Sequence, residues 1–177
     1  MVRVTPIPGS VGCIALSDYR NDGDHRALEA MVFEPDGHGL GVLSHFFWDP
    51  SIWQWVRTRS LVDDALGPAP LIQSDYIKGK DHHNLETIAW RMRADVPVLQ
   101  HWHRQDDIGS LDWVSGAILS SRPQGPASLI SSDFWGDADH RNFEAIFAEI
   151  DNDVWHCFRT QDTMLWTTVG SGMTTVT

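Results

Sequence analysis

The chain has 177 residues, which is enough for one compact domain with an adequate hydrophobic core. Its formal net charge of −11 argues against a nucleic-acid-binding surface, which needs clustered positive charge. No apolar run is long enough to span a membrane, and the N-terminus has no apolar signal core. We therefore expect a soluble, cytoplasmic protein with neither a nucleic-acid nor a membrane partner. The two cysteines, Cys13 and Cys157, have no CxxC partners and are expected to be small buried apolar residues.

One pattern of residues occurs three times along the chain. Each copy begins with an apolar run that leads into Ser-Asp and an aromatic residue, at positions 17–19, 74–76 and 132–134. An Asp-His pair follows in each copy, and a glutamate lies four residues after the histidine: Glu29, Glu86 and Glu144. A period of 57 to 58 residues predicts one supersecondary unit used three times. We expect a single domain over residues 1–177, with units at about 8–66, 69–121 and 126–177.

In chain order, each unit divides into four segments of strand length, rich in β-branched and aromatic residues and separated by turn residues. In the second unit the strands are expected at 71–76, 84–90, 98–103 and 113–119. The second and third strands of the other units are expected at 28–33 and 42–47, and at 143–148 and 154–158. The Gly-rich stretch 37–41 is expected to be a hairpin loop, and no long segment has helical periodicity. The sequence predicts an all-β protein with three tandem four-stranded repeats.

The second strands indicate how the units pack. Phe143, Ala145 and Phe147 would lie on one face of a sheet, with Glu144, Ile146 and Ala148 on the other. Both faces are largely apolar, which is typical of sheets covered on both sides, such as propeller blades. Three blades are too few to close a ring, so we expect a homo-oligomer, a dimer, that completes it head to tail. A β-trefoil, which also has three four-stranded repeats, is the alternative.

The glutamate of each unit lies in the middle of a strand among apolar neighbours, where an unpaired carboxylate would be costly. A histidine recurs on each third strand, at His45, His101 and His156. We interpret each Glu and His as a pair that fixes the strands of its unit. The recurrence favours this structural role, because function rarely needs three identical copies of one device.

Aromatic residues that close each unit are the candidates for ligand contact. A tryptophan follows an Asp-bearing loop in every unit, and an arginine precedes that loop in two of them. Sugars stack on flat aromatic rings, while carboxylates and arginines hold their hydroxyl groups. The predicted ligand-binding residues are Trp55, Trp113, Trp166, Arg104, Arg159, Asp106 and Asp162. The alternative is that these tryptophans only close the core between units.

The third unit resembles the repeat of the PLL-like bacterial lectins. The resemblance lies in Ser-Leu-Ile-Ser-Ser-Asp-Phe at 128–134, Arg-Asn-Phe-Glu-Ala-Ile at 141–146, and Val-Trp-His with Arg159 and the closing Trp166. The second unit is close to this pattern over 71–113, and the first is weaker over 14–55. These lectins are seven-bladed propellers that bind fucose and related sugars. The resemblance implies sites between neighbouring blades, lined by tryptophan and polar residues, although this chain has three repeats.

An enzyme that uses Asp, His and Glu residues converging from the repeats, of cyclase, isomerase or hydrolase type, is the alternative function. The sequence has no Gly-x-Ser-x-Gly elbow and no phosphate-binding glycine loop. Histidines at 82, 83, 101 and 103 are suitable metal ligands in composition, but no HExxH spacing is present. We expect no metal and no cofactor, and a sugar or other small molecule as the partner.

Overall fold

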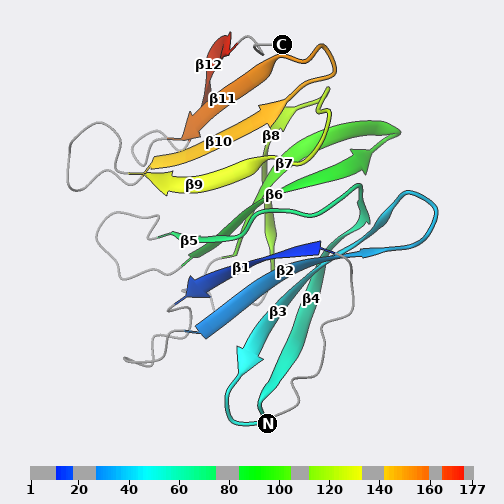
Figure 1. Ribbon diagram of the computed structural model, residues 1–177, viewed down its shortest axis with the longest axis vertical. Coiled ribbons are helices and arrows are strands. Elements are labelled where there is room, and N and C mark those ends of the chain that lie inside the picture. Colours follow the sequence, from blue (N-terminus) through cyan, green and yellow to red (C-terminus); the bar gives the residue numbers. More distant parts are fainter. Residues whose placement is uncertain are drawn as a thin grey trace.

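The computed structural model describes residues 11–17, 27–74, 84–104, 112–132, 142–159 and 165–173 (Figure 1). These ranges contain twelve strands and no helix, so the all-β prediction is confirmed. The same ranges hold no helix that could cross a membrane. The strands are β1 (Val11–Ser17), β2 (Ala27–Pro35), β3 (Gly41–Asp49), β4 (Gln54–Ala65), β5 (Ile72–Ser74), β6 (Asn84–Arg93), β7 (Val96–Arg104), β8 (Val114–Ser120), β9 (Ser128–Ser132), β10 (Asn142–Ala148), β11 (Val154–Arg159) and β12 (Trp166–Met173).

Every pairing between these strands is antiparallel, and the strands form two sheets. In the first sheet β1, β2, β3 and β4 pair in chain order, as do β5, β6, β7 and β8. One residue pair, Ala65 with Arg91, joins these two groups through β4 and β6. The second sheet contains β9 to β12, again in chain order, and neither sheet closes into a barrel among the described residues. We call β1–β4 set 1, β5–β8 set 2 and β9–β12 set 3.

Two hairpins show how local sequence places the strands. The β2–β3 turn contains Gly37 and Gly39, both with positive φ, and Asp36 Oδ1 accepts hydrogen bonds from the amides of His38 and Leu40. The Gly-rich stretch is therefore a hairpin loop, as predicted. The β6–β7 turn places Ala94 and Asp95 at φ 48° and 64°, the backbone of a tight two-residue hairpin.

Face-to-face packing of the sets forms the core (Figure 1). One buried cluster lies between sets 1 and 2 and includes Met31 and Leu43 from set 1 with Leu85 and Ala89 from set 2. A second cluster lies between sets 2 and 3 and consists of Ile88, Leu99, Ala127, Leu129, Phe143, Ala145, Phe147 and Cys157. Set 2 is thus covered on both faces, because its second strand is apolar on both sides. Cys157 is buried as expected, whereas Cys13 is half-buried against the first cluster, and both are free thiols.

Substitution of Gly116 on β8 measures how tightly set 2 is packed around His101. A methyl group at Gly116 would come within 2.5 Å of His101 Nδ1 and 3.3 Å of its carbonyl oxygen. Gly116→Ala must therefore displace a buried imidazole, and we expect it to lower the free energy of unfolding by roughly 1–3 kcal/mol. Urea unfolding at one fixed protein concentration measures the change.

The control is Gly125→Ala, because a methyl group there has no heavy atom within 4 Å. Its free energy of unfolding should stay within about 0.5 kcal/mol of the wild type. Equal effects of the two substitutions would show that Gly116 does not contact His101.

Candidate functional site at the seams between the strand sets

A glutamate on the second strand and a histidine on the third strand meet in every set. Glu29 and His45 approach to 2.8 Å, Glu86 and His101 to 2.7 Å, and Glu144 and His156 to 2.5 Å, each through Oε2 and Nε2. Burial of the first two pairs is nearly complete, with side chains no more than 2% exposed. The predicted contact between the glutamate and histidine is confirmed in all three sets.

A serine on the first strand holds the other carboxylate oxygen. Ser74 Oγ donates to Glu86 Oε1 at 3.1 Å, and Ser132 Oγ donates to Glu144 Oε1 at 2.9 Å. Each of these carboxylates therefore has two partners, from the two strands that flank β6 or β10. Burial of a carboxylate is tolerated when both oxygens are paired in this way. The serine belongs to the repeated Ser-Asp-aromatic motif, and its bond to the glutamate was not predicted from the sequence.

His45 also accepts a hydrogen bond from the neighbouring set. Arg104 Nη1 of set 2 lies 2.9 Å from His45 Nδ1, and Thr58 Oγ1 lies 2.9 Å from the same nitrogen. A guanidinium can only donate, so Nδ1 is the unprotonated nitrogen and the proton is on Nε2, toward Glu29. Burial lowers the pKa of His45, and the positive charge of Arg104 lowers it further. The hydrogen bond and negative charge of Glu29 raise it, but not enough to cancel the effect of burial. His45 is thus a neutral link between a carboxylate in its own set and an arginine in the next.

The same residue types meet at both interfaces between sets. Trp113 lies edge-on to His45, with ring centroids 5.6 Å apart, and Trp166 lies edge-on to His101 at 5.5 Å. Arg104 and Arg159 have equivalent positions, since each pairs with the residue just before the glutamate of its own set. We call these interfaces seam 1 (Glu29, His45, Arg104 and Trp113) and seam 2 (Glu86, His101, Arg159 and Trp166).

The structure brings four of the predicted ligand-binding residues to the seams: Trp113, Trp166, Arg104 and Arg159. Both arginines are buried, so within the described residues they contribute to seam packing. Trp55 lies apart from the seams, on the outer face of set 1, against Trp48 and a small cluster of Ala30, Val32 and Phe46. Asp106 and Asp162 lie outside the described residues.

Two of the closing tryptophans have an indole N–H without a partner in the part of the chain that the structure describes. Nε1 of Trp113 and Nε1 of Trp166 are buried and have no hydrogen-bond partner among the described residues. A buried indole N–H normally has a partner. Each seam therefore holds one buried donor, which a ligand or a water molecule could satisfy only by entering the seam.

A metal-compatible group is found at seam 2. Glu86, His101 and His103 place one ligand atom each within 4.8 Å of one another. Two histidines and one carboxylate can bind zinc or iron. However, the equivalent Glu–His pairs also form in sets 1 and 3, where Phe47 and Phe158 stand in place of His103, so the pair does not depend on a metal. The positive charge of Arg159 also acts on His103 and opposes a second cation there.

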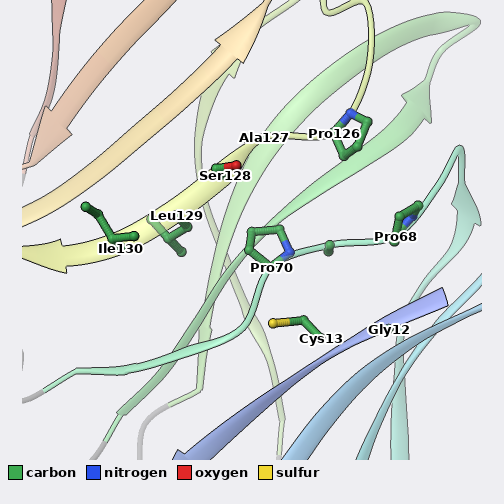
Figure 2. Close-up of a pocket in the computed structure, with 10 residues that line it drawn as sticks. Gly12, Cys13, Pro68, Pro70, Pro126, Ala127, Ser128, Leu129 and Ile130 are labelled. Atoms are coloured by element: carbon green, nitrogen blue, oxygen red, sulfur yellow. The ribbon is translucent and has the colours of Figure 1, made fainter.

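A separate groove of about 420 Å³ lies where the first strands of the three sets come together. Figure 2 shows Cys13 of β1 and Leu129 of β9 on opposite sides of the connection that carries Pro68 and Pro70. Its lining is mostly apolar and includes no charged side chain. Specific small-molecule sites need placed polar groups, so this groove is a weaker candidate than the seams.

Comparison with known proteins does not identify a family for this chain. No protein-family model matches this chain, and no curated protein matches it.

His103 allows a test of the electrostatics of seam 2. Burial lowers the pKa of His103, and the nearby His101 and Arg159 lower it further. The negative charge of Glu86 raises it, but the net shift is downward. An unfolded histidine titrates near pH 6.5, above the pKa of His103 in the folded protein. Between these two pKa values the unfolded state therefore binds a proton more readily than the folded state does. The contribution of His103 to stability is therefore complete above about pH 6.5 and is lost as the pH falls toward the folded pKa.

We expect His103→Phe, which installs the residue of sets 1 and 3, to fold normally and to lose less stability on acidification. Melting temperatures from pH 7.5 to 5.0 measure the slope. Some slope should remain, because burial also lowers the pKa of His45. Identical slopes for the variant and the wild type would show that His103 does not titrate in this environment.

Proposed function

We propose that the protein is a lectin-like protein that binds a carbohydrate or other small polar ligand at the seams between its strand sets. The observation that carries the proposal is the recurrence of one arrangement at two seams: a closing tryptophan whose indole N–H has no partner within the described residues, beside a histidine and an arginine. An aromatic surface and a fixed donor are what a neutral sugar needs.

We also propose that the three sets are blades of a propeller. Adjacent first strands support this arrangement, since β1 contacts β5 and β5 contacts β9 (Figure 1). Stacking of whole sheet faces through the two core clusters supports it further. The β-trefoil is less compatible with this stacking, because its strands form a barrel. The sequence resemblance to PLL-like lectins favours the same architecture and a sugar ligand.

An enzyme is the second candidate function, and one observation favours it. Glu86, His101 and His103 form a compact group of a carboxylate and two imidazoles, in which His103 has a lowered pKa and is half-buried. A neutral histidine beside a carboxylate can act as a general base. The binding function is preferred because the seam arrangement occurs twice, whereas this group occurs once in the described residues.

A glycan array identifies the ligand, and titration calorimetry then compares variants with the wild type. Trp113→Ala should weaken binding by roughly 1–3 kcal/mol, the range for an aromatic anchor. Trp113→Phe should weaken it by about 1 kcal/mol or more, because one aromatic ring remains while the N–H donor and part of the stacking surface are lost. Circular dichroism should show unchanged strand content in both variants, and a chelator should leave binding unchanged.

The matched control is Trp90→Phe. Trp90 also has a buried Nε1 without a partner among the described residues, but it lies on β6 outside the closing position. Its substitution should leave affinity unchanged. An array on which nothing binds, full affinity in Trp113→Ala, or affinity lost with the chelator would each contradict the proposed function.

A further inference from the structure

In the described part of the chain, no further strand set covers either end of the stack. Set 1 presents its Glu29–His45 face to set 2, and set 2 presents its Glu86–His101 face to set 3. The corresponding face of set 3 carries Glu144 and His156, and no further set follows it among the described residues. We call this the trailing face (Ile130, Glu144, Ile146, His156 and Val169), whose residues are joined by the strand register.

The trailing face is more exposed than the equivalent Glu–His faces of sets 1 and 2. The side chain of His156 is 35% exposed, against no more than 2% for His45 and His101. Three apolar side chains around it are also exposed, namely Ile130 at 57%, Ile146 at 44% and Val169 at 48%. The third Glu–His pair is therefore built like the other two, but it lacks the cover that a neighbouring set provides.

The opposite end of the stack carries residues equivalent to that cover. At each seam the covering residues are a tryptophan at the start of a fourth strand and the arginine just before the loop that precedes it. The register pairs Arg159 with Trp166 in set 3, and Trp48 with Trp55 in set 1. Trp48 and Trp55 thus have the positions of the covering residues.

These tryptophans lie on the outer face of set 1, which we call the leading face (Ile14, Leu16, Phe46, Trp48 and Trp55). Ile14 and Leu16 on this face are 63% and 58% exposed. Both ends of the stack therefore expose apolar side chains, and within the described residues no other strand set packs against either end. They also carry the two halves of a seam.

We propose that a second copy of this chain docks head to tail, so that its leading face covers the trailing face of the first copy. Trp48 and Trp55 of the second copy then lie against Glu144 and His156 and complete a third seam, which the described residues of one copy do not form. Two identical junctions close a ring of six strand sets, as a heterologous contact does when its rotation returns to the start. This inference uses the seams of the proposed function.

The third seam should differ from the other two in its ligand. A tryptophan, Trp48, stands where seams 1 and 2 have a buried arginine. This junction consequently has two aromatic rings and no equivalent guanidinium. It favours an apolar or aromatic ligand, or a closed dry contact, over a sugar held by a cation.

The test is sedimentation of the full chain and of two end-face variants. The wild type should sediment as a dimer of the 19.9 kDa chain at micromolar concentration. Ile146→Asp on the trailing face and Ile14→Asp on the leading face should each give a monomer, because either change alters both junctions. The control is Val96→Asp in the β6–β7 hairpin, since Val96 has the same 44% exposure as Ile146 and should leave the dimer intact.

Mixing the two monomeric variants decides whether the contact is head to tail. The intact trailing face of Ile14→Asp can bind the intact leading face of Ile146→Asp, so the mixture should form dimers through one junction. A contact between like faces would not be restored by mixing. A monomeric wild type, dimeric end-face variants, open-ended oligomers or no recovery on mixing would each overturn the proposal.

Failure of this inference can be told apart from failure of the proposed function. Seams 1 and 2 lie within one chain, so monomeric Ile146→Asp should retain glycan binding there. A wild type that is monomeric and still binds glycan would overturn only the head-to-tail junction, whereas a dimer that binds no glycan contradicts the proposed function alone.

Discussion

The buried pairing of a glutamate with a histidine is the interaction on which the rest of this structure depends. A carboxylate in the middle of a strand, between two packed sheets, is tolerated because a serine and an imidazole occupy its two oxygens. Those partners come from the strands on either side, so one carboxylate joins three of the four strands. Removal of either partner would leave a buried polar group unpaired.

The same pair also defines how one set recognises the next. In seam 1 the imidazole that serves Glu29 through one nitrogen accepts from Arg104 of set 2 through the other. The closing tryptophan then packs edge-on against that ring. Within the described residues, set 3 leaves its Glu144–His156 pair uncovered, and set 1 has covering residues that face no pair. The proposed ligand sites and the proposed head-to-tail contact are both consequences of this arrangement.

Sequence periodicity was sufficient to predict the strands and the contact between Glu86 and His101, because both depend on position within one unit. It could not reveal the role of Arg104, which was interpreted as a ligand donor. That arginine is buried against His45, 59 residues away, and such a contact depends on how whole sheets pack. The Ser74 hydroxyl was visible as a repeated residue, but its role became apparent only with the strand register. Trp55 was grouped with the other closing tryptophans, yet its partner set is absent from the described part of the chain.

A double-mutant cycle on Glu86 and His101, compared with one on Glu144 and His156, tests the central claim most directly. We expect Glu86→Ala and His101→Ala each to destabilise the protein, with a coupling free energy of about 1–3 kcal/mol, since the second change removes an already unpaired group. The cycle on Glu144 and His156 should give a smaller coupling free energy in the monomeric Ile14→Asp background, which leaves the trailing face unchanged and His156 partly open to water. Additive effects at Glu86 and His101, within about 0.5 kcal/mol, would contradict the account.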